Sequence, residues 1–466
     1  MDGASKSFQW LFFVKNEKDK IMNRHSRIIL FLLVVFSVAF LAFNLVPEKQ
    51  YYPWSDEGYY YRYGSQIEQE GLPGLKKLLS WYAGDEKARY HPAPTRIGYL
   101  FIVSILFRIF GPSYVLLGLI SFVSFLCFLW ISFYFIKKYV DEAAAWHATA
   151  LLSSSPLLLA MSRRALTDSM INLSWALSFW LFFDFLHPPT QDAAPLKNGA
   201  EERESGIVSA SADVRPFLEK GTTSVVGLHK PQAKKYFFLI ASLAWALLVK
   251  EASVILLPLF AFFFLVERKY FNLAVPRIYF WGILLGPIAI AGPCFFVALG
   301  GWENIFVAIK AILSTHFDPH YSNQYATVFC VGPWYRYLVD FLLLSPCMML
   351  LFLGQFFWLL LEKKKTLMER YLLFYCVSIF VFFSSLSHTK VVRFVISLEM
   401  VIALFAFFYI LKISKKVGEG HAAKITLLII IFLFTTNWLN FYSIFFKTGL
   451  LDPISFHLLR TMQFIP

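Results

Sequence analysis

Two adjacent carboxylates stand among aromatic residues shortly after the first apolar segment of the chain. Asp56 and Glu57 follow Tyr-Tyr-Pro-Trp-Ser and precede Gly-Tyr-Tyr-Tyr, within the stretch 51–63. Tyrosine and tryptophan by themselves suit the interfacial region of a membrane, whereas a carboxylate gains little there. The pair therefore indicates either acid–base chemistry at a membrane surface or a solvated turn that happens to carry Asp-Glu.

Other ionisable residues are expected on the same side of the membrane. They are His91, Arg163, Arg164, Asp168, Lys250, Glu251, His316, Asp318, His320, His388, Lys390 and Arg393. Taken singly, each has a structural interpretation as a snorkelling turn, a hairpin tip or a helix end. Their coincidence on the side opposite to the basic loops favours function, because cations placed against the positive-inside rule suit an anionic ligand.

Carboxylates, cations and aromatic rings on one membrane face fit a polyprenyl-phosphate sugar. Its tail is apolar, its phosphate pairs with Arg and Lys, and its sugar can stack on aromatic rings. An acceptor hydroxyl would attack the anomeric carbon with inversion, while a carboxylate takes the hydroxyl proton and cations stabilise the departing phosphate. The sequence has no Gly-rich phosphate loop and no Asp-x-Asp motif, which argues against a nucleotide-sugar donor.

Composition predicts an all-α polytopic membrane protein. Of the 466 residues, 58% are hydrophobic, 19% aromatic and only 16% charged, which excludes an ordinary soluble domain. The formal net charge of +13 is explained by basic cytoplasmic loops and does not require nucleic acid. Of the 5 cysteines, only Cys330 lies in an expected loop, so neither a disulfide framework nor a Cys metal cluster is indicated.

Eleven apolar segments are expected to cross the membrane. The first, 28–46, is uncharged, and at about 1.5 Å per residue it is just long enough for a core of about 30 Å. It is expected to be a retained span behind a basic cytoplasmic N-terminus, since it lacks the features of a cleaved signal peptide. The others are 115–136, 143–161, 170–186, 236–249, 252–266, 278–299, 337–361, 371–386, 394–411 and 425–446.

The segment 97–110 decides the topology. It is apolar but short, contains Arg108, and is expected to lie on the outer surface. If it crossed, the basic clusters at 137–138, 363–365 and 412–416 would all face outward, against the positive-inside rule. The N-terminus is then inside and the C-terminus outside. Lys250 and Glu251 would form the outer tip of a hairpin, because one continuous helix would place both charges at mid-membrane.

The expected domain organisation follows from these spans. The insert 187–235 is rich in Pro, Ala, Ser, Gly and charge, and is expected to be a disordered cytoplasmic linker. The divisions are a basic N-terminus (1–27), a transmembrane module (28–186) with an outer catalytic loop (47–114), the insert (187–235), a second module (236–446) with an outer loop (300–336), and an outer tail (447–466).

Several short motifs together carry a family resemblance. They are Asp56-Glu57 after the first span, His91-Pro92, Phe110-Gly111 before a long span, Lys137-Lys138 at its inner end, Ser155-Pro156, and Arg163 followed by Asp168. With them the chain resembles the membrane glycosyltransferases of the GT-C class, especially the group of protein O-mannosyltransferases and the lipid A aminoarabinose transferase. The resemblance covers roughly residues 28–187 well and the remainder loosely.

The resemblance implies a GT-C-like bundle of about eleven transmembrane helices, with short interfacial helices in the outer loops. It implies that Asp56 is the general base and that Arg163 lies on the phosphate side. Val249-Lys250 looks like the family's Thr-Lys hairpin with Val in place of Thr. The segment 388–394 is similar to the His-Lys-Glu-x-Arg-Phe segment of lipid-linked mannosyltransferases, but it lacks the Glu and separates His from Lys. The acceptor is left open.

The expected roles can be stated by residue. Asp56 and Glu57 are catalytic, with Asp56 the base. The cations expected to hold the donor phosphate are Arg163, Arg164, Lys250, Lys390 and Arg393. The residues expected to bind substrate are Tyr59, Tyr60, His91, Asp168, His316, Asp318, His320, Trp334 and His388.

A metal site is not predicted. Two imidazoles and one carboxylate in 316–320 could bind zinc, but a structural zinc site normally has four ligands, and Pro319 restricts the backbone. Contact with the acceptor, or plain loop polarity, is favoured. The expected partners are a polyprenyl-phosphate sugar, membrane lipids and an acceptor of unknown identity, with no nucleic acid. No cofactor is indicated, and a divalent metal is left open.

Two other functions share the composition. A polysaccharide polymerase or ligase with a lipid-diphosphate donor would have the same fold and the same outer site. A lipid-linked sugar transporter would instead place ionisable groups near mid-membrane, between broken helices. The intramembrane candidates are His147, Asp184, Asp340 and Glu399, and no pairing among them is evident in the sequence. The expected location is a plasma or inner membrane, with the active face periplasmic or extracellular.

Overall fold

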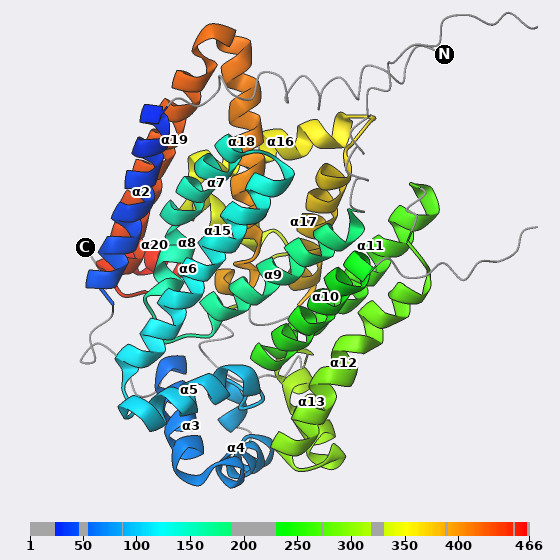
Figure 1. Ribbon diagram of the computed structural model, residues 1–466. Helices are drawn as coiled ribbons and strands as arrows, with labels where there is room; N and C mark the ends of the chain where they lie inside the picture. Colours follow the sequence, from blue (N-terminus) through cyan, green and yellow to red (C-terminus); the bar gives the residue numbers. More distant parts are fainter. Residues whose placement is uncertain are drawn as a thin grey trace, which may run out of the picture.

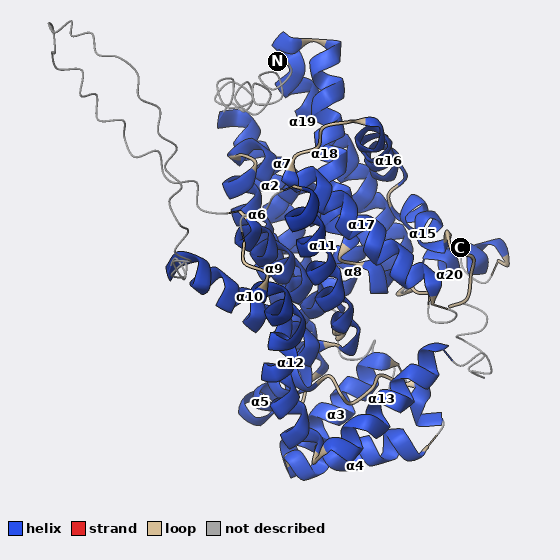
Figure 2. Ribbon diagram, turned by 90° about the vertical axis from the view of Figure 1, so that its right-hand side faces the viewer, coloured by secondary structure: helices blue, strands red, loops and turns tan. Residues whose placement is uncertain are grey.

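The chain is helical throughout the parts that the structure describes. The computed structural model describes residues 24–45, 55–85, 87–187, 230–271, 275–317, 330–386, 390–450 and 453–463. Within these ranges every regular element is a helix, as Figure 2 shows. A helix satisfies its own backbone hydrogen bonds, which is what a segment in lipid requires. The predicted all-α membrane class is confirmed.

Seven helices of the described residues are long and apolar enough to cross a membrane, judged by length and composition. They are α2 (Arg24–Phe43), α6 (Tyr114–Tyr139), α9 (Asp168–Leu186), α10 (Lys230–Val249), α12 (Ile278–Leu299), α17 (Leu367–Ser385) and α19 (Ala422–Asn440) with its π-helical continuation η6 (Phe441–Phe446). The other expected spans coincide with α7 (Glu142–Ser154) and α8 (Pro156–Ser162), α11 (Leu256–Tyr270), α15 (Arg336–Leu344) and α16 (Pro346–Leu361), and α18 (Leu398–Val417). The number of eleven spans stays a prediction.

Two expected spans are broken at a proline. The segment 143–161 divides into α7 and α8 at Ser155, which has φ −57° and ψ 122°. The segment 337–361 divides into α15 and α16 at Ser345, which has φ −146° and ψ 67°. The residue before a proline is pushed out of the helical region, and Pro is well placed in the first turn of the next helix. Both expected spans are therefore helical but interrupted.

The domain division predicted from composition stays a prediction. Residues 188–229 of the expected insert are not among the described residues. Helix α10 begins at Lys230, inside the range expected for the insert. The predicted outer loop 47–114 carries α3 (Asp56–Glu70), α4 (Leu72–Gly84), the short η2 (Lys87–Tyr90) and α5 (Ile97–Phe110).

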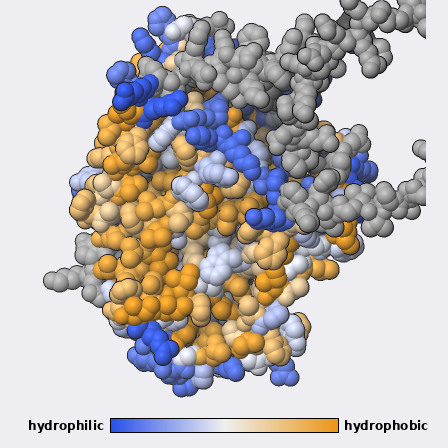
Figure 3. Space-filling view, in the orientation of Figure 1, coloured by the Kyte–Doolittle hydropathy of each residue, from blue (hydrophilic) through white to orange (hydrophobic). Residues whose placement is uncertain are grey.

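The molecule has two polar ends separated by an apolar band. Helices α3, α4 and α13 (Trp302–Phe317) lie at the bottom of Figures 1 and 2, and the connection between α18 and α19 lies at the top. The last turn of α18 carries Lys415 and Lys416. Figure 3 shows orange side chains between the hydrophilic ends. The acidic helix α3 and the basic turn of α18 therefore lie at opposite ends of the molecule.

Helix α9 is the centre of the packing. In its apolar window, 83% of the residues are buried inside the protein. Its rings Phe179, Trp180, Phe182 and Phe183 are fully buried against neighbouring helices. Close packing of this kind holds membrane helices together, because lipid tails leave little hydrophobic force between them. The N-terminus of α9, with Asp168 at its first position, is thereby fixed in the middle of the bundle.

Helix α3 is held close to α5 by a small residue. A Cβ added to Gly64 would lie 2.3 Å from Cγ1 of Val103, so only glycine allows this approach. One residue earlier, the Tyr63 hydroxyl donates to the Pro92 carbonyl at 3.0 Å. These contacts fix α3 over the bundle, with its N-terminus toward α9.

Candidate active site

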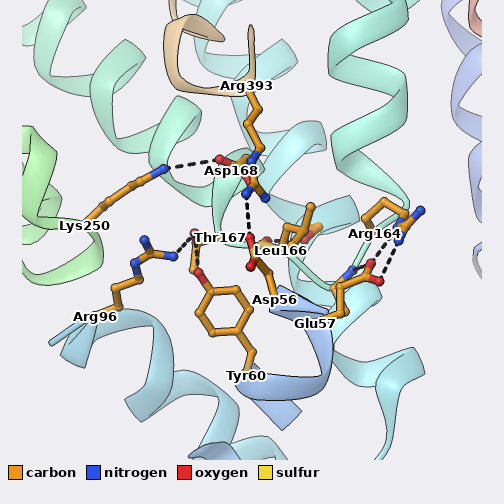
Figure 4. Close-up of polar contacts among 12 residues, drawn as sticks. Asp56, Glu57, Tyr60, Arg96, Arg164, Leu166, Thr167, Asp168, Lys250 and Arg393 are labelled. Carbon is orange, nitrogen blue, oxygen red and sulfur yellow. Dashed lines mark hydrogen bonds and ion pairs between the residues drawn. The ribbon is translucent and has the colours of Figure 1, made fainter. Parts of the chain in front are cut away.

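The first helical residue of α3 contacts a cation from the C-terminal half of the chain. Nη2 of Arg393 donates to Oδ2 of Asp56 at 2.5 Å (Figure 4). Arg393 lies in η4 (Val392–Val395), the short helix that precedes α18. The structure thus brings together two residues that the sequence had assigned to different roles at one site.

Two further charges extend this pair into a chain. Nη1 of Arg393 lies 3.7 Å from Oδ2 of Asp168, and Oδ1 of Asp168 lies 3.3 Å from Nζ of Lys250. The side chains of Asp168 and Lys250 are 3% and 8% exposed, whereas Asp56 is 30% exposed. The charges alternate in sign from the buried Lys250 to the accessible Asp56. We call these four residues, Lys250, Asp168, Arg393 and Asp56, the Asp56–Lys250 chain.

Electrostatics keep Asp56 ionised. Burial alone would raise its pKa, but the charge and hydrogen bond of Arg393, with the charges of Arg96 and Lys250, hold the pKa below its ordinary value of 3.8. Lys250 is affected in the other direction. Burial lowers the pKa of Lys250, and the charges of Arg96 and Arg393 lower it further. The charge of Asp168 acts in the opposite direction and raises this pKa.

A second group of polar residues adjoins the Asp56–Lys250 chain, and two of its members, Arg96 and Thr167, were missed in the sequence. The Arg96 guanidinium donates from Nη1 to Oγ1 of Thr167 and from Nη2 to Oε1 of Glu251, both at 3.4 Å. It also lies 5.5 Å from the centre of the Tyr60 ring, whose hydroxyl is 3.3 Å from Oγ1 of Thr167 (Figure 4). Arg96 precedes the apolar segment 97–110 on the expected outer side. The rule that singled out other cations placed against the charge bias would have found it.

Glu57 points away from Asp56. Nε and Nη2 of Arg164 donate to its two oxygens at 2.6 and 2.7 Å, and the Ala165 amide donates to Oε1 at 3.2 Å (Figure 4). The Glu57 side chain is 1% exposed. The pair forms a clamp between α3 and the turn after α8. Glu57 and Arg164 therefore pair with each other. This pairing does not support the expected catalytic role of Glu57 or the expected phosphate-binding role of Arg164.

Two other cations expected at the phosphate make structural contacts. Nε of Arg163 donates to the Asn44 carbonyl at 3.1 Å, and its guanidinium lies 4.5 Å from the centre of the Phe446 ring. Nζ of Lys390 donates to the Gly332 carbonyl at 2.8 Å, so this residue ties down the segment that leads to Arg393. The structure does not bring either cation to the Asp56–Lys250 chain. Sequence order alone did not reveal where these side chains point.

His91 and Tyr59 lie near Asp56, as expected. The Tyr59 hydroxyl is 2.7 Å from Nε2 of His91, and the two rings stack with centres 3.8 Å apart. Trp81 lies nearly parallel to both rings. Burial lowers the pKa of His91, although the charge of Asp56 opposes the shift. Trp81 was not singled out in the sequence, which offered no signal beyond its aromatic type.

The outer loop 300–336 is described only in part. Trp334 is largely exposed and contacts Tyr335 and Phe380. His316 lies in helix α13, but its side chain is not described. Asp318, His320 and His388 lie outside the described residues. In the described part of the chain, no group of three or more His, Cys, Asp and Glu residues is placed to hold a metal ion. The zinc hypothesis for 316–320 is left without a test.

An apolar cavity of about 540 Å³ begins beside these charges. Its polar end is formed by Arg96, Lys250, Glu251 and Asn172. Apart from Thr95 and Ser397, the rest of the wall is apolar. It comes mainly from α12, α13 and α17, with Ala291, Gly292, Phe295, Ile305, Ile309, Phe382 and Phe383 among its residues. A cavity with cations at one end and hydrocarbon along the rest suits an amphiphile with an anionic head.

Comparisons with known proteins found one matching family model and several solved structures of similar fold. A sequence model described as dolichyl-phosphate-mannose-protein mannosyltransferase matches residues 91–192. That range contains His91, Arg96, Thr167 and Asp168, but neither Asp56 nor Arg393. No curated protein sequence matches the chain.

Solved structures share the fold at low sequence identity. ArnT from Cupriavidus metallidurans bound to undecaprenyl phosphate aligns with TM-score 0.54 and 12% identity over 88% of this chain and 75% of that one. The apo oligosaccharyltransferase of Archaeoglobus fulgidus aligns with TM-score 0.56 and 11% identity over 88% of this chain and 55% of that one. AglB from the same organism, in complex with an inhibitory peptide and a dolichol-phosphate, aligns with TM-score 0.54 and 11% identity over 90% and 56%.

This chain spans about half the length of the archaeal oligosaccharyltransferase. The likeness nevertheless extends over most of the chain, which confirms the expected resemblance to the GT-C class. The chain has the fold of the GT-C membrane glycosyltransferases, and its segment 91–192 matches the dolichyl-phosphate-mannose-protein mannosyltransferase family.

Proposed function

We propose that this protein is an inverting membrane glycosyltransferase that moves a sugar from a polyprenyl phosphate to an acceptor hydroxyl. The observation that carries the proposal is the meeting of the apolar cavity with the Asp56–Lys250 chain at Lys250. A lipid tail, an anionic head and a carboxylate base can all be accommodated at this one junction. Membership of the fold alone would not carry the proposal, because a fold hosts many functions.

The cavity supports a polyprenyl tail. Its apolar wall would hold the hydrocarbon, and Lys250 and Arg96 stand where the chain of isoprene units would end in a phosphate. Charge-assisted hydrogen bonds from an ammonium and a guanidinium are well suited to a phosphate. ArnT was solved with undecaprenyl phosphate and AglB with a dolichol-phosphate, which are ligands of this chemistry.

Asp56 supports the proton transfer. The acceptor hydroxyl would give its proton to the Asp56 carboxylate while its oxygen bonds to the anomeric carbon. The bond between that carbon and the phosphate oxygen would break, and the phosphate would leave with the electron pair. Arg393, Lys250 and Arg96 would stabilise the negative charge that grows on it. Attack from the side opposite to the leaving phosphate inverts the anomeric centre.

The contact between Asp56 and Arg393 gives the donor a second effect. In the structure, Arg393 is shared between Asp56 and Asp168. A phosphate near Lys250 would compete with Asp56 for this guanidinium. Weaker pairing would raise the proton affinity of Asp56, because the burial of this carboxylate would then be less compensated. Donor binding would thus make Asp56 a better base.

The active face is proposed from the charge distribution. The α3 end of the molecule lies opposite the basic last turn of α18 (Figure 1). Basic residues favour the cytoplasmic side, so the Asp56–Lys250 chain would face the periplasm, lumen or exterior. The acceptor would then be a lipid, glycan or protein hydroxyl in that compartment.

The transporter alternative has less support. Asp184 is paired with Lys138 and Lys235, and Asp340 with Arg336 one helical turn away, so these carboxylates have local partners that the sequence analysis overlooked. A transport path would require ionisable groups that line a passage. A lipid-diphosphate donor would use the same cavity and the same cations, and the donor assay below separates it from a monophosphate.

A donor screen with two cavity variants tests the proposal. The purified protein is incubated with undecaprenyl-phosphate and undecaprenyl-diphosphate sugars, and release of the lipid phosphate is followed. Gly292 lines the cavity and a Cβ there meets open space, so Gly292→Trp should fill the cavity and abolish use of the donor. Ile290→Trp on the same helix, at an exposed position away from the cavity wall, is the control. No use of any monophosphate donor by the wild type, or equal activity in both variants, would overturn the proposal.

A further inference from the structure

Glu251 contacts Arg96, but the proposed phosphate chemistry gives Glu251 no role. Arg96 stands at the start of α5, and Glu251 opens η3 (Glu251–Ile255) directly after Lys250. Their contact joins two parts of the chain that are 155 residues apart. Both residues line the polar end of the cavity.

The two side chains are not fully used by their mutual contact. Nη2 of Arg96 and Oε1 of Glu251 are 3.4 Å apart, which is longer than a well-formed charge-assisted hydrogen bond. Within the described residues, Nε of Arg96 and Oε2 of Glu251 are buried without a hydrogen-bond partner. Buried polar atoms in native proteins are normally satisfied, and an exception at a cavity wall indicates a missing ligand. One unused donor and one unused acceptor stand together at the mouth of the cavity.

The carboxylate is the informative member of the pair. It lies beside Lys250, where the proposed donor would place its phosphate, and like charges repel at short range. Arg96 and Lys250 lower the pKa of Glu251 against the effect of burial, so the group is an ionised acceptor. An ionised acceptor that faces an anionic ligand needs a donor on the neighbouring part of that ligand. In a sugar phosphate, the nearest hydrogen-bond donors are the groups on the sugar ring.

We propose that Glu251 is a specificity residue that accepts a hydrogen bond from a hydroxyl or ammonium of the donor sugar, while Arg96 contacts the phosphate beside it. This inference rests on the proposed function, and it deepens that function by assigning recognition of the sugar to the end of the cavity wall. The pair is present in the structure, with one polar atom of each side chain unused. Its unused atoms are completed by a phosphate and a sugar at once.

The alternative role for Glu251 is to hold Arg96 in place. A purely structural carboxylate would affect every ligand of Arg96 to the same extent. A residue that contacts the sugar would affect only ligands that carry the sugar. Binding of lipid phosphates with and without a sugar therefore separates the two roles.

The test uses the full chain purified in detergent and two classes of probe. Undecaprenyl phosphate reports the phosphate contacts, and undecaprenyl phosphates that carry mannose, arabinose or aminoarabinose report the sugar contacts. For the wild type, we expect tighter binding of at least one glycosylated lipid than of undecaprenyl phosphate. Glu251→Gln should weaken the binding of that glycosylated lipid by about tenfold or more, because a hydrogen bond to a charged group is lost. The affinity for undecaprenyl phosphate should stay within about twofold of the wild type. Arg96→Gln should weaken both classes.

The outcomes are distinct. If the wild type binds no lipid phosphate, the proposed function fails. If the wild type binds both classes and Glu251→Gln weakens both equally, the function stands and the assignment of Glu251 is overturned. If Glu251→Gln does not fold, the same comparison is made with Glu251→Asp, which keeps the charge and withdraws the carboxylate by one methylene. A selective loss for the glycosylated lipid supports the assignment, and an equal loss overturns it. A preference for aminoarabinose over arabinose that disappears in the variant identifies the ammonium as the donor, and an unchanged order identifies a hydroxyl.

Discussion

Arg393 and Asp56 are 337 residues apart in the chain, yet Nη2 of the one lies 2.5 Å from Oδ2 of the other. The contact joins the two halves of the protein at the candidate active site. It also unites the residue that the family resemblance marks as the base with a cation placed against the positive-inside rule. Arg393 also lies 3.7 Å from Oδ2 of Asp168, so this guanidinium is near two carboxylates.

The first prediction concerns pH. Arg393 lowers the pKa of Asp56, so in the free protein this carboxylate stays ionised down to a pH below its ordinary 3.8. The acid limb of kcat/KM, which reports the free enzyme, should therefore lie below that pH. In Arg393→Gln it should move upward, since burial then acts with less opposition. An acid limb that does not move in the variant would contradict the pairing, and His91→Gln serves as a control for titration of the neighbouring imidazole.

The same pairing sets the sign of its contribution to stability. A lowered pKa in the folded state means that the Asp56–Arg393 pair contributes stability above the ordinary carboxylate range. This contribution is lost as the pH falls through the lowered pKa of the folded state. The pH dependence of thermal unfolding should be flatter in Arg393→Gln than in the wild type at the acid end.

The second prediction concerns the phosphate cations. Arg393→Gln and Lys250→Met should each weaken donor binding by roughly 10- to 150-fold, because each removes a charge-assisted contact. Arg163 contacts the Asn44 carbonyl and Phe446. Folded Arg163→Gln protein should therefore bind the donor as the wild type does. The measurement is binding of undecaprenyl phosphate by each purified variant. A large effect in Arg163→Gln with none in Lys250→Met would reverse the assignment.

The third prediction concerns the clamp. Glu57 is buried and receives two hydrogen bonds from Arg164, and breaking a buried ion pair costs about 3–5 kcal/mol. Glu57→Gln should therefore unfold at a lower temperature in detergent. Glu70→Gln on the same helix removes the exposed pair with Lys77, which is expected to matter by about 1 kcal/mol or less. Equal thermal stability of the two variants would show that the clamp does not hold α3.

The fourth prediction concerns orientation. Lys77 on α4 and Lys363 after α16 are both exposed, and they are expected on opposite sides of the membrane. In intact vesicles, a membrane-impermeant thiol reagent should label Lys77→Cys from the outside and Lys363→Cys only after permeabilisation. Labelling of both from one side would refute the proposed topology.

The membrane class and most of the helices could be predicted from the sequence. Long apolar segments have few alternatives to a helix in lipid, so their positions were predictable. The two breaks before Pro156 and Pro346 were also visible in principle, because the residue before a proline disfavours the helix. They were missed because hydropathy alone does not distinguish a broken span from a continuous one.

The candidate site was predictable only in its chemistry. The sequence indicated that Asp56, Asp168, Lys250 and Arg393 share one membrane face, and the structure joins them in one chain of charges. Which of two adjacent residues points inward depends on local backbone direction. The backbone directs the side chains of Asp56 and Glu57 to different places. Composition does not predict this direction. Arg96 was overlooked because the rule for cations placed against the charge bias was not applied to it.

The most direct test of the central claim is the turnover of Asp56→Asn with a polyprenyl-phosphate sugar that the wild type uses. The substitution keeps the shape of the side chain and removes the proton acceptor. General base catalysis typically contributes about 10²- to 10⁴-fold, so turnover should fall by that factor while undecaprenyl phosphate still binds. Transfer by Asp56→Asn at the wild-type rate, at matched amounts of folded protein, would contradict the role of Asp56 and the active site built around it.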